Sequence, residues 1–290
     1  MPKNKLSKNF AIIAGSQGYK MIKSLGRSLY IDPIKTPFGE SAPIREVTKN
    51  GTKVFILSRH GETGYQISAP FVNYRANIWA LKELGVERII SWSGPGAIDP
   101  SIPIGELLVL GDIIDETKGR SCTFYERLGI GFIRQNPVFC PELAARLAQA
   151  IVARQGHCRT DDIYACTQGP RLETRAEIKK FASYGATLVG MTLVPEAFLA
   201  RELEMCYCPV CYITNYAEGI VERSYEPGEL FEGLLSGEEK AKVDAAVDAL
   251  PGIVIEALTS VPDERECKCH LAMERYRRQG TIGEDWHSWI

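Results

Sequence analysis

The segments FAIIAGSQG, at residues 10–18, and VFILSRHG, at residues 54–61, share one pattern. Each begins with a short apolar run rich in β-branched side chains and ends in glycine and polar residues. Such a run, bounded by turn-forming residues, is typical of a buried β-strand. We therefore expect two strands, each followed directly by polar residues at its carboxyl end.

The same alternation continues along the chain, with apolar runs separated by segments of helical period. Tyr74, Ile78 and Leu81 recur at helical spacing, and Val243, Val247 and Leu250 do so near the end of the chain. The further predicted elements are strands at 88–92, 163–167 and 208–214 and helices at 73–84, 173–184 and 195–204. Strands alternating with helices predict an α/β fold, in which ligands bind at the carboxyl ends of the strands.

Composition narrows the range of partners. The 290 residues include 34 Lys and Arg against 36 Asp and Glu, and 45% are hydrophobic, which is ordinary for a globular protein. A formal net charge of -2 gives no reason to expect a nucleic acid or an anionic membrane as partner. No apolar run approaches the length of a spanning helix, so we expect a cytoplasmic protein with a small-molecule ligand.

Nine cysteines are present, without the paired spacing typical of a zinc site. Cys206, Cys208 and Cys211 lie in one apolar stretch with no histidine beside them, and we interpret them as buried free thiols. Cys267 and Cys269 are separated by a single residue and could form a strained redox pair or half of a staple between two segments. We expect no bound metal.

Several polar residues at predicted strand ends could together bind a small anion. The loop at 15–18 offers backbone amides and the Ser16 hydroxyl, Arg59 a planar guanidinium, and His60 a further donor. Ser93, Gly94 and Thr192 add two hydroxyls and an unhindered amide. Taken singly, the loop could be a plain turn, and Arg59 and His60 a surface arginine and a packed histidine. If all converge, they suit inorganic phosphate.

Six motifs together carry a family resemblance that extends from residue 12 to about residue 257. They are TPFG at 36–39, RHG at 59–61, VNYRANIWAL at 72–81, GPRLET at 169–174, GMT at 190–192 and VPE at 194–196. On these residues the chain resembles the trimeric purine nucleoside phosphorylase and methylthioadenosine phosphorylase family.

The resemblance implies a three-layer α/β/α fold with a mixed, barrel-like central sheet, active as a homotrimer or a hexamer of two trimers. We therefore expect a phosphorylase domain over residues 1–260 and, beyond the resemblance, a carboxyl-terminal helical tail over residues 261–290. We expect the end of this tail, residues 275–290, to dock on a neighbouring subunit. The implied reaction is phosphorolysis of a purine nucleoside in purine salvage, with inorganic phosphate as co-substrate and no cofactor.

The resemblance also assigns roles to individual residues. Those implied to hold phosphate are Ser16, Arg59, His60, Ser93, Gly94 and Thr192. Met191 would lie against the ribose, while Leu172, Glu173 and the stretch Asn215-Tyr216-Ala217 would face the purine. Asn215, Arg59 and His60 are the implied catalytic residues.

Glu173 and Asn215 bear on the choice of purine. A carboxylate and an amide match the N1 hydrogen and the O6 and N7 acceptors of a 6-oxopurine. Family members that use methylthioadenosine carry a small hydroxyl residue and an aspartate at these positions. The chain therefore favours 6-oxopurines, and residues 164–174 are similar to bacterial methylthioinosine phosphorylases, which favours a 5'-methylthio group over a free hydroxyl.

Two departures from the family pattern support an alternative. Gln17 stands at a position that is usually glycine, and Gly64 at one that is commonly histidine. The alternative is a catalytically weak, phosphorylase-like protein that binds a purine nucleoside or another flat aromatic ligand.

Overall fold

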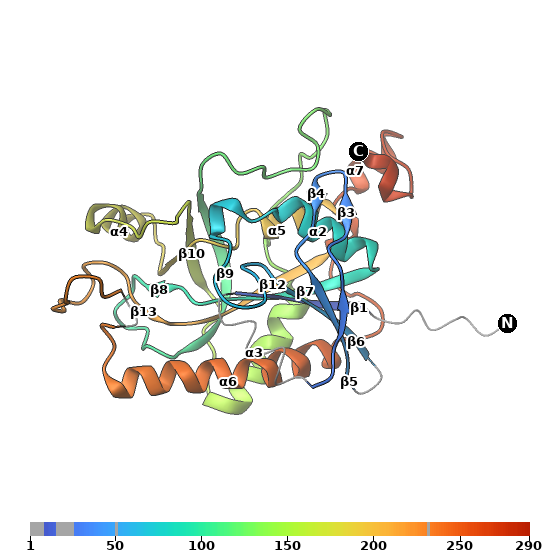
Figure 1. The fold of residues 1–290 in the computed structure, drawn as a ribbon. Coiled ribbons are helices and arrows are strands. Elements are labelled where there is room, and N and C mark those ends of the chain that lie inside the picture. The colour runs from blue at the N-terminus through green and yellow to red at the C-terminus, as the bar shows by residue number, and fades with distance from the viewer. Residues whose placement is uncertain (1–8, 16–25, 50–51, 231–232) are drawn as a thin grey trace.

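A computed structural model describes residues 9–15, 26–49, 52–230 and 233–290 (Figure 1). Its centre is a mixed sheet of eleven strands in the order β13-β8-β11-β10-β9-β12-β7-β1-β6-β5-β2. These strands are β1 (Asn9–Ala14), β2 (Leu29–Ile31), β5 (Ile44–Lys49), β6 (Thr52–Ser58), β7 (Val86–Ser93), β8 (Gly96–Ala97), β9 (Leu107–Glu116), β10 (Asp162–Thr167), β11 (Leu188–Gly190), β12 (Cys206–Tyr212) and β13 (Asn215–Tyr216). A separate hairpin consists of β3 (Lys35–Thr36) and β4 (Gly39–Glu40).

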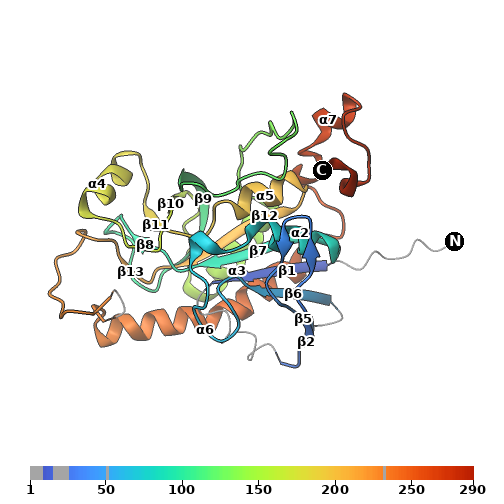
Figure 2. The same ribbon diagram turned by 45° about the horizontal axis from the view of Figure 1, so that its top comes forward.

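Helices cover both faces of this sheet (Figure 2). Helices α3 (Pro141–Gln155) and α6 (Gly237–Ser260) pack together on one face, and α2 (Tyr74–Glu83) and α5 (Glu196–Glu202) on the other. The remaining helical segments are α4 (Arg175–Ser183), α7 (Glu274–Arg278) and the 3-10 turns η1 (Ala69–Phe71), η2 (Cys269–Leu271) and η3 (Trp286–Trp289). The predicted three-layer α/β/α arrangement around a mixed sheet is confirmed.

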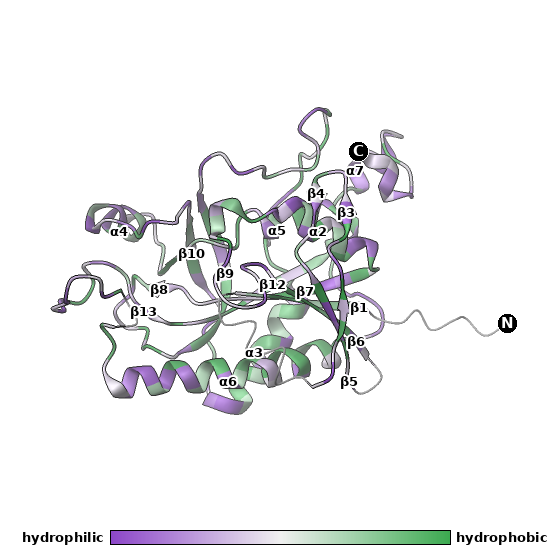
Figure 3. Ribbon diagram, in the orientation of Figure 1, coloured by the Kyte–Doolittle hydropathy of each residue, from purple (hydrophilic) through white to green (hydrophobic). Residues whose placement is uncertain are grey.

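The central strands carry the core. In β1 the five residues from Phe10 to Ala14 are all at most 1% exposed, and all residues of β12 are buried. A strand covered by helices on both faces cannot alternate polar and apolar residues, which explains the continuous apolar runs seen in the sequence. Figure 3 shows the same concentration of hydrophobic residues along the sheet.

Strands β1, β6, β7 and β12 run parallel to one another, so their carboxyl ends meet at one edge of the sheet. Ala14 pairs with Ser58, and Ser93 pairs with Cys211, at this edge. The residues that follow β1 and β6 and those that end β7 are therefore brought together, as the sequence predicted.

The predicted element boundaries are close to the observed ones. Helix α2 begins at Tyr74 because the Asn73 side chain caps it, accepting from the Ala76 N–H at 3.2 Å. The strand predicted at 208–214 instead starts at Cys206, where it pairs with Arg88 of β7. None of the described helices combines the length and apolarity that crossing a bilayer requires.

The carboxyl-terminal segment packs on its own chain, and its docking on a neighbouring subunit stays a prediction. The ring of Trp286 lies 4.6 Å from that of Trp79 on α2, and His287 Nε2 lies 3.1 Å from the Glu83 carboxylate. Trp289 is only 3% exposed and is therefore covered within the same chain, whereas Ile290 at the end of the segment is 43% exposed.

Candidate active site

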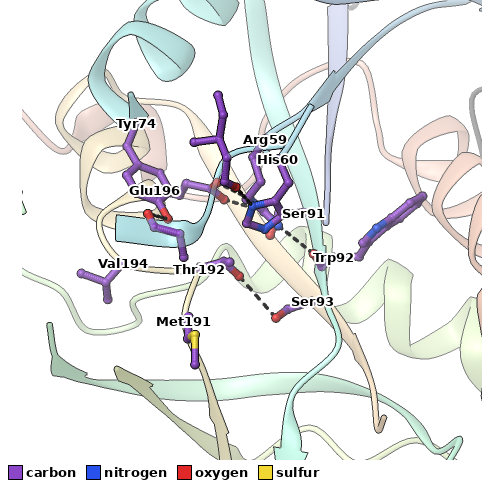
Figure 4. Close-up of polar contacts among 12 residues, drawn as sticks. Arg59, His60, Tyr74, Ser91, Trp92, Ser93, Met191, Thr192, Val194 and Glu196 are labelled. Atoms are coloured by element: carbon purple, nitrogen blue, oxygen red, sulfur yellow. Dashed lines mark hydrogen bonds and ion pairs between the residues drawn. The ribbon is translucent and has the colours of Figure 1, made fainter. Parts of the chain in front are cut away.

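Four side chains form a buried group at the carboxyl ends of the central strands, here called the inner cluster: Arg59, Ser93, Thr192 and Glu196 (Figure 4). Arg59 follows β6, Ser93 ends β7, Thr192 follows β11 and Glu196 begins α5. The sequence predicted the convergence of the first three. Ser16, expected beside them, lies outside the described residues.

Arg59 and Glu196 form a buried ion pair. Arg59 Nε lies 2.6 Å from Glu196 Oε1, and Nη2 donates to Oε2 at 2.8 Å. Burial by itself lowers the pKa of the guanidinium, but the charge of Glu196 and its hydrogen bonds outweigh burial and raise that pKa. The forked edge of Arg59, predicted to grip phosphate with two bonds, is therefore occupied by a carboxylate.

The other end of the Arg59 guanidinium faces the start of the loop at 15–18. Nη1 donates to the Trp92 carbonyl at 3.1 Å, and a Cβ on Gly15 would come within 3.5 Å of it. Three of the five N–H groups thus have protein partners. Among the residues that the structure describes, two N–H groups have no partner and could donate to an anion beside Gly15.

Glu196 is held from a second side as well. Tyr207 donates its hydroxyl hydrogen to Glu196 Oε2 at 2.8 Å and lies 2.7 Å from the Ser91 hydroxyl. This network fixes the carboxylate, and through it the orientation of Arg59. The sequence contained Glu196 in a motif but gave no sign of this pairing, because 137 residues separate Glu196 from Arg59.

Two hydroxyls of the inner cluster point at each other across the strand ends. Ser93 Oγ lies 3.4 Å from Thr192 Oγ1 and 3.3 Å from the Tyr164 hydroxyl. Gly94 follows, and a Cβ there would come within 2.6 Å of Thr214 Cγ2. Only glycine fits at this position, because Thr214 and Tyr212 pack closely against it.

His60 lies next to the inner cluster, but its hydrogen bonding differs from the predicted role of a donor to the anion. Its Nδ1 is 2.7 Å from the Ile67 carbonyl oxygen, which can only accept, so Nδ1 carries the proton. Burial first, and the positive charge of Arg59 second, lower the pKa of His60 to about 4. The neutral ring therefore presents Nε2 as an acceptor.

Arg120, which the sequence did not single out, links the strand ends on the other side of the site. Its guanidinium donates to the carbonyls of Met191 at 2.8 Å, Gln168 at 2.7 Å and Thr167 at 3.1 Å. These bonds hold the segments after β10 and β11 together. The Met191 sulfur in turn lies beside Gly169, where a Cβ would approach it to 2.5 Å.

The residues predicted to face a purine form a second, less buried group, here called the outer cluster: Leu172, Glu173 and Asn215. Thr167 Oγ1 donates to Glu173 Oε1 at 2.5 Å. Asn215 Oδ1 accepts from Thr214 Oγ1 at 2.7 Å, and Nδ2 donates to the Tyr216 carbonyl at 2.8 Å. Within the described residues, one amide hydrogen of Asn215 and one carboxylate oxygen of Glu173 have no partner and could contact a ligand.

A cleft lies beside the Asn215 part of the outer cluster. It is lined by Asn215 and Ala217 on the β13 side and by Arg175 at the start of α4. Glu173 lies two residues before Arg175, in the loop that leads into α4. Leu172 is 44% exposed on that loop.

The phosphorylase superfamily model matches residues 9–258. The chain belongs to the phosphorylase superfamily. A 6-oxopurine nucleoside phosphorylase of Pyrococcus furiosus is 37% identical, with 91% of this chain and 97% of the relative covered. A probable S-methyl-5'-thioinosine phosphorylase of Methanothermobacter thermautotrophicus is also 37% identical, with 90% and 88% covered.

The fold of this superfamily member also matches solved structures. A methylthioadenosine phosphorylase from an Antarctic soil metagenomic library superposes with a TM-score of 0.79 at 30% identity. The match covers 92% of this chain and 91% of that structure. The predicted family and fold are both confirmed.

Proposed function

We propose that the protein cleaves the N-glycosidic bond of 6-oxopurine nucleosides with inorganic phosphate. The products are the free purine and ribose 1-phosphate, or 5-methylthioribose 1-phosphate where the substrate carries a methylthio group. Family membership and relatives named for 6-oxopurine and methylthioinosine substrates support this reaction. The observation that carries it is the convergence of the Ser93 and Thr192 hydroxyls beside Arg59 at the strand ends.

The inner cluster suits the phosphate half of the reaction. The two hydroxyls, and the Arg59 N–H groups that have no partner among the described residues, can donate to a dianion. His60 Nε2 can accept the remaining proton of hydrogen phosphate. An anion held under the sugar stabilises the positive charge that grows on the ribosyl ring as the bond breaks, and then attacks that carbon.

The outer cluster suits the purine half. Glu173, oriented by Thr167, has an oxygen free to accept the N1 hydrogen of a 6-oxopurine. Asn215 has one amide hydrogen free to donate to N7 or O6, and so to stabilise the negative charge of the leaving base. Adenine lacks the N1 hydrogen, so it would leave the carboxylate unpaired.

Met191 is the residue proposed to lie against the ribose, with Ala217 lining the purine side. Arg120 supports this role of Met191, because its bonds to the Met191 and Thr167 carbonyls fix the segment between the two clusters. The similarity of residues 164–174 to methylthioinosine enzymes favours a 5'-methylthio group. Inorganic phosphate is the proposed co-substrate, and no cofactor is proposed for the reaction.

We further propose that the protein acts in purine salvage in the cytoplasm, as a homotrimer or hexamer. The nine cysteines are free thiols, as is usual in a reducing compartment. Phe71 and Phe132 are 75% and 81% exposed, and large exposed aromatics of this kind often mark subunit interfaces. Light scattering of the purified protein would test the assembly.

The reaction is tested by supplying methylthioinosine, inosine, methylthioadenosine and adenosine, each with and without phosphate. We expect release of free hypoxanthine that requires phosphate and is faster than release of adenine. Tight nucleoside binding with no phosphate-dependent product would instead support the catalytically weak binding protein.

A further inference from the structure

Four cysteine sulfurs far apart in the sequence meet at one point in the structure. Cys140, Cys206, Cys267 and Cys269 are all buried, and their sulfur atoms all lie within 4.8 Å of one another. Cys140 precedes α3, Cys206 begins β12, and the other two lie after α6, where the chain turns into η2. All four are free cysteines, and the sulfurs of Cys206 and Cys267 are 3.3 Å apart.

This spacing fits one small ion at the centre of four thiolates. Sulfur atoms 2.3 Å from a tetrahedral zinc lie about 3.8 Å from one another, within the observed limit. A cluster of several irons and sulfides would keep the cysteine sulfurs further apart. We propose that Cys140, Cys206, Cys267 and Cys269 bind one Zn²⁺ as a tetrathiolate site.

The charges around the four sulfurs support such a site. Four thiolates and Zn²⁺ carry a net charge of about -2, which a buried site must compensate. Arg201 Nη1 donates to Cys269 Sγ at 3.5 Å, and its Nη2 donates to the Pro137 carbonyl at 2.9 Å. Arg201 Nε is buried and has no hydrogen-bond partner in the part of the chain that the structure describes, so one N–H of this cation still lacks an acceptor.

The site is separate from the inner cluster. Cys206 lies at the amino end of β12 opposite Arg88, whereas Cys211 lies opposite Ser93 at the other end. Five residues of strand place the two regions roughly 16 Å apart. All four ligands come from protein, which leaves no open coordination position and indicates a structural rather than a catalytic metal.

The site would join the carboxyl-terminal segment to the phosphorylase core. Cys267 and Cys269 lie beyond the family match, which ends at residue 258, whereas the other two ligands lie within it. Nearby, the Glu266 N–H donates to Glu142 at 2.9 Å, and Arg88 donates to the Pro262 carbonyl at 3.1 Å. Binding Zn²⁺ releases four thiol protons to solvent and adds its binding free energy to this attachment.

The sequence led us to expect no metal. Of the four proposed ligands, only Cys267 and Cys269 are close in the chain, and one intervening residue is not the usual zinc spacing. The other two ligands became visible only when α3 and β12 were placed side by side. Cys208 and Cys211, which are nearer to Cys206 in the sequence, do not belong to the four.

Metal analysis of the full chain, purified under reducing conditions without chelator, tests the proposal. We expect one zinc per chain after desalting. The zinc should then be released in proportion to the thiols that an added mercurial reagent modifies. Cobalt(II) loaded in its place should give the intense sulfur-to-metal charge-transfer absorption of a tetrathiolate. Neither measurement depends on the folding of a variant.

Substitutions then locate the ion. Cys206→Ser and Cys269→Ser should reduce bound zinc to background, whereas the matched controls Cys122→Ser and Cys158→Ser, outside the four, should retain one zinc per chain. Zinc-free wild-type protein after incubation with excess zinc, or iron bound at one per chain, would overturn the proposal. So would two disulfides among the four cysteines, detected by mass after alkylation without reduction.

Discussion

The inner and outer clusters lie on different parts of the fold and are held in place by different kinds of contact. The inner cluster stands on central strands, and its charged members are buried and paired across more than a hundred residues. The outer cluster stands on the last short strand of the sheet and on a loop, and its side chains make local hydrogen bonds within six residues. The inner cluster is therefore tied to stability, while the outer cluster can change with little cost to the fold.

Glu196→Gln should show the largest effect. It leaves the buried Arg59 guanidinium without its counter-charge, which typically destabilises a protein by about 3–5 kcal/mol. Urea unfolding measures the loss. Glu238→Gln is the control, because Glu238 pairs with Lys242 at 2.7 Å in solvent, and we expect no measurable change there. Equal losses of unfolding free energy for the two variants would contradict the proposed dependence of stability on the inner cluster.

The same pairing limits the use of Arg59→Ala as a probe of phosphate binding. That substitution would leave Glu196 buried without its cation, so a lower activity would mix lost folding with lost binding. Hydroxyls of the inner cluster are better probes because they carry no charge.

His60 predicts a pH dependence of stability with a definite sign. Its pKa in the folded protein is about 4, below the unfolded value near 6.5, so the unfolded chain binds the proton more tightly. Titration of His60 leaves the free energy of unfolding at its full value above pH 6.5 and lowers it by up to about 3 kcal/mol as the pH drops to 4. His60→Gln should lose this part of the dependence in urea unfolding measured at several pH values.

Glu202 provides a control of opposite sign. Burial raises the pKa of its carboxyl to about 7, so its contribution to stability is lost as the pH rises through 7. Glu202→Gln should therefore change the profile in the direction opposite to His60→Gln. Identical profiles for wild type and His60→Gln would show that His60 titrates normally.

The outer cluster should control the choice of base. Glu173→Ser combined with Asn215→Asp should shift the ratio of kcat/KM for inosine over adenosine towards adenosine by roughly one to two decades. Urea unfolding should be nearly unchanged, since both side chains are only partly buried. An unaltered ratio would remove these residues from base recognition.

Ser93→Ala should give the smallest effect, confined to phosphate. Loss of one or two hydrogen bonds worth about 1–2 kcal/mol raises the KM for phosphate roughly 5- to 30-fold and leaves the nucleoside KM near its starting value. Ser183→Ala, at the exposed end of α4, is the matched control. Equal increases in both KM values would contradict the role of Ser93.

The sequence predicted what local pattern and strand-end chemistry can specify. Helix α2, strands β1 and β7, and the meeting of Arg59, Ser93 and Thr192 follow from apolar runs that end in polar residues. What it missed depends on long-range pairing, such as the Arg59–Glu196 bridge and the carbonyl contacts of Arg120.

The carboxyl-terminal tail and the cysteines also make contacts between distant residues that the sequence did not predict. Residues 275–290 lie beyond the family resemblance, and only the fold showed that Trp286 packs on Trp79 and that Trp289 is buried within its own chain. Likewise, Cys140 and Cys206 carry no signal of convergence in a sequence where 66 positions separate them.

A crystal structure of the protein soaked in phosphate tests the central claim most directly. The account predicts one ion within hydrogen-bond distance of Ser93 Oγ, Thr192 Oγ1 and an N–H of Arg59, at the carboxyl ends of β1, β6 and β7. Phosphate bound elsewhere, with no ion touching these three side chains together, would contradict it.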